Sequence, residues 1–268
     1  MAKLTHEKRV EIAKQKEPRT QAEKDQALTV RKSNQLIQRN RFDLSLREQR
    51  LLLYCISRIK PTDKGTETYE IAIRDVCKAC GIDETINGGS YNAMKAALKK
   101  LDSFNFELKE PTGRVHLVHW IRSVVIDPEN KNQAKVHFEF DPKIVPYLFD
   151  VRKFFTQYEL RGVLLMKSVY GIRLYELLKS YANIREKEFE LDELRHILGA
   201  ESKSYEKYGL FRTNVLDPAI RDINTCSDLK VDYIEFKSGR KVVNIRFVIT
   251  DIGGTAEYLE RQGWTFED

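Results

Sequence analysis

Residues 203–224 read KSYEKYGLFRTNVLDPAIRDIN, and residues 229–249 read LKVDYIEFKSGRKVVNIRFVI. In the first segment, large apolar residues recur at spacings of three and four, which places them on one side of a helix. The residues on this side are Tyr205, Tyr208, Phe211, Val215, Leu216, Ala219, Ile220 and Ile223. The spacing therefore predicts one long helix over residues 203–224, with one side packed against a core.

The opposite side of this predicted helix is largely polar. It carries Lys203, Lys207, Leu210, Asn214, Asp217 and Arg221. The second segment reads as two strands around a tight turn at Ser238-Gly239, with Lys237, Arg240 and Lys241 at its tip. A helix that fits a DNA groove, followed by a basic hairpin, is typical of the reading end of a winged helix. The same pattern also fits an ordinary amphipathic helix on a small sheet, because charged solvent-facing sides are common.

The first half of the chain has the same order of predicted elements. A predicted strand and short helix end at Gly81 in one half and at Gly199 in the other. Residues 97–101, ALKKL, correspond to residues 219–223, AIRDI. We therefore predict an α+β fold of two tandem winged-helix domains related by internal duplication. This duplication does not say what the domains bind.

The duplication sets the predicted domain boundaries. We expect an N-terminal winged-helix domain over residues 31–150 and a C-terminal one over residues 151–252. Residues 1–30 are polar and charged, which predicts a flexible basic tail. Residues 253–268 are expected to form a C-terminal tail.

Local signals place further elements in the first half. Ser45 and Glu48 have the spacing of a capping box, which predicts the start of a helix. Residues 114–126, RVHLVHWIRSVVI, read as one strand. Residues 90–103 predict a helix whose apolar side is Tyr91, Met94, Ala97, Leu98 and Leu101. Away from that side lie Asn92, Lys95, Lys99 and Lys100, which are expected to correspond to the polar side of the later helix or else to be simply solvated.

Composition limits the class of protein. The 268 residues are 41% hydrophobic and 32% charged, which is typical of a globular protein with a charge-rich surface. The net charge of +6 favours a polyanionic partner. No apolar run approaches the roughly 18 residues that cross a bilayer, and the first residues lack the apolar segment of a secretory signal. We expect a cytoplasmic protein with no membrane partner.

Motifs for catalysis and metal binding are weak. The chain contains no Gly-x-x-x-x-Gly-Lys-[Ser/Thr], Gly-x-Ser-x-Gly or His-Glu-x-x-His motif, and no His-x-His pair of the kind that holds metal in a nicking enzyme. Cys77 and Cys80 have the spacing of metal ligands, and His116 and His119 could complete a site. However, residues three apart on a strand point to opposite faces. We predict no metal, no cofactor and no catalytic residue.

Three segments of the second half resemble the replication initiator (Rep) proteins of iteron-containing plasmids. They are residues 155–158 (FTQY), 171–178 (GIRLYELL) and 215–224 (VLDPAIRDIN). The first half resembles the family more loosely, through residues 40–49 (NRFDLSLREQ) and a YEIAI strand. The resemblance extends over about residues 30–250 and rests on the ordered set of segments rather than on one motif.

The resemblance implies a function. In this family the C-terminal winged helix reads the repeated origin sequence, the iteron, through the major groove. The N-terminal one adds DNA backbone contacts in the monomer and otherwise forms the dimer interface. Monomers help to open the origin and recruit host proteins, whereas dimers commonly repress the initiator's own gene. The implied partners are double-stranded origin DNA, the host initiator and helicase, chaperones, and a second copy in a monomer–dimer equilibrium that bears on plasmid copy control.

The resemblance also assigns roles to residues of the predicted helix. The expected base contacts are Lys203, Lys207, Arg212, Thr213 and Asn214. Arg and Asn pair bidentately with guanine and adenine edges. Arg212 falls on the packed side, so it reaches DNA only if the helix begins late, near Gly209, or its side chain extends outward. Asp217 is expected to lie past the contact zone or to orient Arg221, and Pro218 to kink the helix.

The predicted site thus has three parts, which are the later helix, the hairpin tip and the earlier helix. The full set of predicted DNA-binding residues is Lys203, Lys207, Arg212, Thr213, Asn214, Arg221, Lys237, Arg240, Lys241, Asn92, Lys95, Lys99 and Lys100. Two other functions remain open. One is a winged-helix transcription regulator without initiator activity, and the other is a DNA-nicking Rep enzyme.

Overall fold

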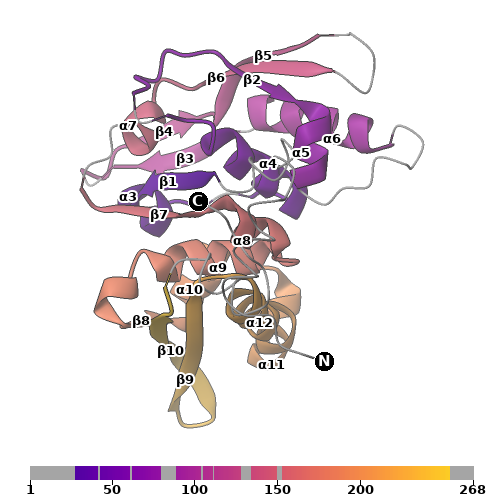
Figure 1. Ribbon diagram of the computed structural model, residues 1–268. Coiled ribbons are helices and arrows are strands. Elements are labelled where there is room, and N and C mark those ends of the chain that lie inside the picture. Colours follow the sequence, from indigo (N-terminus) through magenta and orange to yellow (C-terminus); the bar gives the residue numbers. More distant parts are fainter. Residues whose placement is uncertain are drawn as a thin grey trace, which may run out of the picture.

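The computed structural model describes residues 28–41, 43–60, 62–79, 89–103, 105–110, 112–127, 134–149 and 153–253, with the backbone alone for 89–91. Figure 1 shows two lobes, with the first half of the chain above and the second half below. The predicted tails lie outside the described residues except at their inner ends, where Thr29 and Val30 belong to a strand. The domain boundaries stay a prediction.

The upper lobe contains both helices and strands. Its elements are β1 (Thr29–Ser33), α3 (Asn34–Arg39), α4 (Leu46–Ile56), β2 (Tyr69–Ala72), α5 (Ile73–Ala79), α6 (Gly89–Ser103), β3 (Phe106–Lys109), β4 (Val115–Val118), β5 (Ile121–Ile126), β6 (Lys135–Phe140) and α7 (Val145–Leu148). Helix α4 begins with the predicted capping box, because Ser45 and Glu48 exchange side-chain and backbone hydrogen bonds. This satisfies two backbone N–H groups that the helix itself leaves unpaired.

The second half of the chain begins with a strand that the sequence did not indicate, and this strand lies beside β1 of the upper lobe (Figure 1). The elements of this half are β7 (Phe155–Glu159), α8 (Leu160–Leu165), α9 (Val169–Lys179), η1 (Ala182–Ile184), β8 (Glu186–Glu190), α10 (Leu191–Leu198), η2 (Lys203–Tyr205), α11 (Tyr208–Phe211), η3 (Arg212–Leu216), α12 (Asp217–Cys226), β9 (Leu229–Ser238) and β10 (Lys241–Asp251). Helix α10 ends at Gly199, as predicted, because this glycine adopts a φ of 71°.

The two lobes repeat one sheet topology. The upper sheet has the strand order β2-β6-β5 and the lower sheet β8-β10-β9, so the last two strands form a hairpin and the first pairs with the final strand. In each lobe the first strand of this sheet comes before a set of helices, and the two strands of the hairpin come after them. This is the winged-helix arrangement predicted for a duplicated chain. The hairpin β3-β4 is an addition to the first lobe within the described residues.

The prediction of one strand over residues 114–126 is wrong. The segment forms β4 and β5, which belong to different sheets and are separated by His119 and Trp120. Trp120 is fully buried and stacks on Phe106 with ring centroids 4.7 Å apart. The break between the two strands thus coincides with a buried ring that packs on β3, the partner strand of β4.

The prediction of one helix over residues 203–224 is wrong in its first half. Residues 203–205 form a separate 3₁₀ turn, and helix begins at Tyr208. The next turn, η3, is π-helical, and the N–H of Asp217 bonds to the carbonyl of Arg212, five residues back. A π turn holds one residue more than an α turn. Pro218, which has no N–H to donate, comes directly after this turn, at the start of α12.

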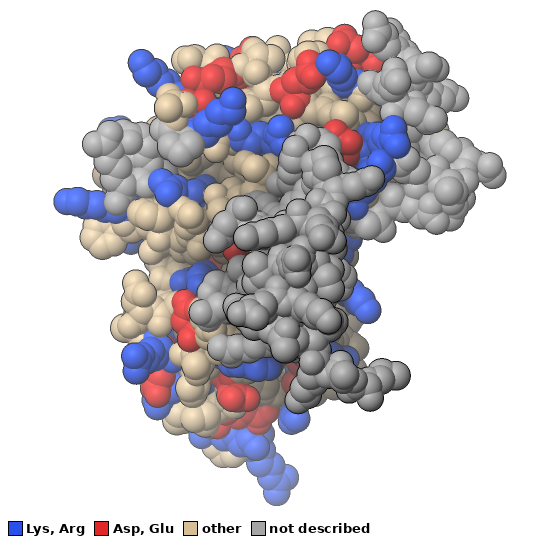
Figure 2. Space-filling view, in the orientation of Figure 1, with Lys and Arg blue, Asp and Glu red and all other residues tan. Residues whose placement is uncertain are grey.

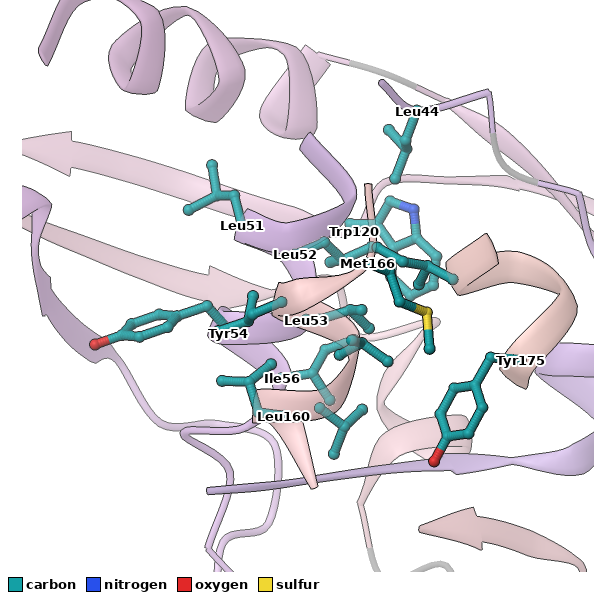
Figure 3. Close-up of a cluster of buried hydrophobic side chains, with 14 of the residues drawn as sticks. Leu44, Leu51, Leu52, Leu53, Tyr54, Ile56, Trp120, Leu160, Met166 and Tyr175 are labelled. Atoms are coloured by element: carbon teal, nitrogen blue, oxygen red, sulfur yellow. The ribbon is translucent and has the colours of Figure 1, made fainter. Parts of the chain in front are cut away.

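A shared core and a two-stranded sheet join the lobes. Strand β1 pairs antiparallel with β7 over five residue pairs, from Thr29 opposite Glu159 to Ser33 opposite Phe155. Figure 3 shows α4 side chains Leu51, Leu52, Leu53 and Ile56 in the same apolar cluster as Leu160, Met166 and Tyr175 from the lower half. The lobes therefore pack as one unit.

Buried charges lie at this junction. Lys32 of β1 forms an ion pair with Glu176 of α9 at 2.6 Å, and both side chains are at most 3% exposed. The hydroxyl of Tyr158 also donates to Glu176. Arg173, one turn away on α9, donates to the backbone carbonyls of Ile37, at 2.7 Å, and Asn40. Burial lowers the pKa of Lys32, although Glu176 acts in the opposite direction.

Candidate nucleic-acid interface

The segment from α11 to α12 presents two distinct sides. Phe211, Val215, Leu216, Ala219 and Ile223 are buried, as predicted. The predicted packed residues Tyr205, Tyr208 and Ile220 are only half-buried at the edge of this side. All six predicted contacts of the segment are exposed, and they are Lys203, Lys207, Arg212, Thr213, Asn214 and Arg221.

Arg212 lies on the exposed side and not on the packed side. Its side chain is 51% exposed, and the helix does begin late, at Tyr208. The π turn explains the position. An α-helix turns about 100° per residue, so one additional residue rotates the residues before the π turn by roughly that angle relative to α12. Arg212, Thr213 and Asn214 thus reach solvent together.

Two carboxylates approach Arg212. Its Nε lies 3.4 Å from an oxygen of Asp217, and its Nη1 lies 3.5 Å from an oxygen of Glu235 on β9. Asp217 thus faces the guanidinium of Arg212, and the expectation that it orients Arg221 is not met, whereas its place relative to the DNA contact zone stays a prediction. In a regular α-helix, residues five apart are about 140° apart around the axis, and the π turn brings them together.

Two tyrosines hold these carboxylates. The hydroxyl of Tyr208 donates to Glu235 at 2.7 Å, and that of Tyr233 donates to Asp217 at 2.9 Å. Burial, and then the bond to Asp217, raise the pKa of Tyr233 to about 12, so its hydroxyl keeps its proton. Burial and the bond to Glu235 raise the pKa of Tyr208 as well. No pattern in the sequence indicated these contacts, since Tyr208 was assigned to the packed side.

The hairpin β9–β10 carries the basic tip that the sequence indicated. Gly239 has a φ of 61° in its turn, and Lys237, Arg240 and Lys241 are exposed around it. Figure 2 shows blue side chains at the lower tip of the molecule, where Figure 1 places this hairpin. The hairpin projects beyond the helices of the lower lobe, as the wing of a winged helix (Figure 1).

A hollow of about 610 Å³ lies between η3 and β9. It is lined by Arg212, Tyr233, Ile234, Glu235 and Lys237. Strand β9 is an edge strand of its sheet, so this hollow lies at an open edge. The ammonium of Lys237 lies 3.8 Å from Glu235, and hence both basic side chains at the hollow face the same carboxylate.

The predicted contacts of the first lobe lie on α6. Asn92 and Lys99 are exposed, and Lys95 is half-buried. Lys100 donates to Glu48 at 2.8 Å, so its ammonium already joins α6 to the start of α4. The predicted packed residues Met94, Ala97, Leu98 and Leu101 are buried, while the side chain of Tyr91 lies outside the described residues.

The residues considered as metal ligands do not gather in the part of the chain that is described. Cys77 is buried, and Cys80 lies outside that part. His116 Nε2 lies 2.8 Å from Glu110. Within the described residues, no group of three or more His, Cys, Asp or Glu side chains could hold an ion, and no helix there has the length and apolarity to cross a membrane.

Two family descriptions match successive parts of the chain. Residues 29–179 match "Initiator Replication protein, WH1", and residues 190–249 match "Initiator Rep protein, WH2". The chain belongs to this initiator replication protein family. The WH1 match of this initiator ends at residue 179, the last residue of α9, so it includes both partners of the β1–β7 pairing.

Known proteins agree with this assignment. The initiator is 27% identical over 235 residues to a replication initiation protein of Escherichia coli, covering 83% of this chain and 69% of that protein. Its fold is similar to that of the Pi initiator protein in complex with iteron DNA, with a TM-score of 0.67, 20% identity and coverage of 85% and 99% of the two chains. It is also similar to domains 2 and 3 of RctB, with a TM-score of 0.53, 12% identity and coverage of 78% and 83%.

Proposed function

We propose that this initiator starts plasmid DNA replication by binding iterons, the direct repeats of an origin, as double-stranded DNA. The π turn carries the proposal, because it brings Arg212, Thr213 and Asn214 to the solvent side of a helix that is packed on its other side. Lys203, Lys207 and Arg221 extend the same exposed surface. A fold similar to an initiator in complex with iteron DNA supports this proposal.

The wing and the first lobe supply contacts of another kind. Lys237, Arg240 and Lys241 bind phosphates beside the groove that the helix reads. In the first lobe, Asn92, Lys95 and Lys99 of α6 bind the backbone, and Lys100 does so if it leaves Glu48. Phosphate contacts position the protein and add affinity for any sequence, whereas base contacts supply the preference.

A second copy of the chain completes the proposal. The dimer, formed through the first lobe, represses the initiator's own gene, and the monomer binds iterons. Strand β4 offers apolar surface for such a contact, because Val115 and Leu117 are 52% and 64% exposed and share one face of the strand. Chaperones would shift the balance toward the monomer.

The initiator acts without chemistry of its own. Bound at iterons, it loosens neighbouring A·T-rich duplex and recruits the host initiator and helicase in the cytoplasm. DNA bending at flexible steps has a cost that repeated binding sites can offset. No cofactor or metal is needed for this role, which consists of binding and presenting surfaces.

A replication test separates this role from the two alternatives. A plasmid that carries only the candidate origin and a selectable marker should persist in a host when the initiator is supplied, and should be lost when Arg212→Ala is supplied. If the plasmid is lost even with the wild-type protein, while that protein still represses its own gene, the result would favour a transcription regulator. Supercoiled origin DNA should stay intact with the purified protein and Mg²⁺, since a nick would indicate a Rep enzyme.

A further inference from the structure

Acidic groups are unusual in a surface that is to meet DNA. Asp217 and Glu235 lie beside the proposed base contacts, where their charges repel phosphates. Each is held in place by a tyrosine hydroxyl from a different element, Tyr233 on β9 and Tyr208 on α11. Bonds of 2.9 and 2.7 Å fix both carboxylates relative to the guanidinium between them. Carboxylates that are held in fixed positions beside an arginine can orient its guanidinium.

We propose that Tyr208, Asp217, Tyr233 and Glu235 form a clamp that positions Arg212 and thereby makes it the main determinant of base preference. This inference rests on the proposed function and names the residues that give it selectivity. The four clamp residues are positioning residues, because they act on DNA through the orientation of Arg212. Arg212 itself is the group that touches the base.

The geometry leaves the guanidinium able to bind. Its two ion pairs, at 3.4 and 3.5 Å, are longer than the roughly 2.7–2.9 Å of a tight charge-assisted hydrogen bond. A guanidinium has five N–H donors, and these contacts engage Nε and Nη1. With half of the side chain exposed, Arg212 keeps donors for the O6 and N7 acceptors of a guanine.

The clamp also lowers the entropic cost of reading. A free arginine side chain loses rotamer freedom when it is ordered on a target. Carboxylates from α12 and β9 restrict Arg212 before DNA arrives, and the π turn is what allows both to reach it. A correct base then gains a preordered partner, whereas a wrong base leaves the clamped donors unpaired.

The test measures binding by fluorescence anisotropy with the iteron repeats and with shuffled DNA of equal length. Glu235→Gln keeps the shape of the side chain and removes its charge. We expect about a tenfold weaker binding to the repeats, since one such base contact is worth about one factor of ten or more. Binding to shuffled DNA should stay equal or strengthen, because one negative charge is gone. Tyr233→Phe should reduce the preference in the same direction by a smaller factor.

A double-mutant cycle and a matched control complete the test. In an Arg212→Ala background, Glu235→Gln should cause no further loss of preference, because the clamp then has nothing to position. Glu188→Gln is the control, because Glu188 on β8 also pairs with an arginine of the same lobe. Its partner is Arg246 on β10, at 2.9 Å. It should leave both affinities unchanged.

Each other outcome counts against the clamp. Equal strengthening on both DNAs would show that Glu235 only competes with phosphate, and an equal loss in the Arg212→Ala background would show that it acts independently of Arg212. A loss on both DNAs with a lower melting temperature would make its role structural. If the wild-type protein does not prefer the repeats, the proposed function fails first, and the inference fails with it.

Discussion

At the scale of single residues, Gly171 explains one of the segments through which the sequence resembles initiators. A Cβ atom at this position would lie 2.9 Å from a carboxylate oxygen of Asp222 on α12. That oxygen accepts backbone hydrogen bonds from Lys167, at 2.8 Å, and Ser168, at 2.7 Å, just before α9. The glycine thus allows α12 to cap the start of α9, and its function is packing.

Gly171→Ala should therefore destabilise the fold. We expect a loss of about 1–3 kcal/mol in the free energy of unfolding, because α9 and α12 must separate or Asp222 must leave its two N–H donors. Urea unfolding followed by circular dichroism measures this change. Gly209→Ala is the control, since no atom lies within 4 Å of a Cβ there, and it should change stability by less than about 1 kcal/mol in either direction. Equal effects of the two variants would contradict this account.

Glu48 gives a pH-dependent prediction. Burial alone would raise its pKa, but bonds from Lys100 and Ser45 outweigh burial, and the pKa is lowered overall. A carboxylate with a lowered folded pKa stabilises the fold above its unfolded pKa and loses that contribution as pH falls through the folded value. Glu48→Gln should cost about 1 kcal/mol near neutral pH. The difference in the free energy of unfolding between Glu48→Gln and wild type should shrink below about pH 4.5. A difference that grows on acidification would contradict a stabilising role of the ionised Glu48.

The sequence predicted most exposed residues of the site but not their contacts. Spacing alone identified Lys207, Asn214 and Arg221 as exposed, because an apolar stripe defines its own opposite side. Arg212 was placed on the packed side, since a helical wheel assumes 3.6 residues per turn and cannot represent a π turn. The partners of Arg212 come from α12 and β9, and the position of β9 relative to the helix depends on the whole domain.

At the scale of elements, the segment from α11 to α12 should supply the preference for iterons, and the wing should supply affinity for DNA of any sequence. Replacing Lys207 and Asn214 together with Ala should reduce the preference for iterons and leave the part of it that Arg212 supplies. Competition binding with labelled repeats and unlabelled shuffled DNA gives the ratio of the two affinities directly. An unchanged ratio would mean that neither Lys207 nor Asn214 reads a base.

The wing should behave in the opposite way. Replacing Arg240 and Lys241 with Ala should weaken binding to all sequences alike and flatten the salt dependence by about one unit for each phosphate that the wing no longer binds. Affinities at several salt concentrations give the slope. A weakening confined to the repeats would instead indicate that the wing reads bases.

Local signals predicted elements well where a cap or a stop residue was present. The capping box at Ser45 and the glycine stop at Gly199 marked the start of α4 and the end of α10. Strand β7 had no such signal and was not predicted, and two predictions of continuous elements failed, at residues 203–207 and at residues 119–120. In both places a continuous apolar pattern conceals a break, since the break comes from packing against distant segments rather than from a Gly or Pro at that point.

At the scale of the whole molecule, two of the three second-half segments that resemble initiators lie at the junction between the lobes, and the third, residues 215–224, lies in η3 and α12. Residues 155–158 form most of the strand that pairs with β1, and residues 171–178 include both Arg173 and Glu176. Their side chains bind the carbonyls of Ile37 and Asn40 and the ammonium of Lys32. The resemblance thus covers both the contacts that join the lobes and part of the segment that is proposed to read DNA.

Removing one charge at this junction should affect the whole fold. Glu176→Gln leaves Lys32 buried without a counter-ion, which should cost about 3–5 kcal/mol in the free energy of unfolding. Glu70→Gln is a matched control, because Glu70 forms an exposed ion pair with Lys135 at 2.8 Å. Exposed pairs contribute little to stability, because water and salt screen their charges. Chemical denaturation of both variants compares the two, and similar losses would mean that the buried pair has no special weight.

The central claim is that the second lobe reads a repeated sequence. Fluorescence anisotropy with the direct repeats near this protein's gene, against shuffled DNA of equal length and at two salt concentrations, tests it most directly. The account predicts binding to the repeats that is about a thousandfold tighter or more, with a preference that persists at the higher salt. Equal, weak binding to both DNAs that disappears with salt would contradict it, and would mean that the basic surfaces are only solvated charge.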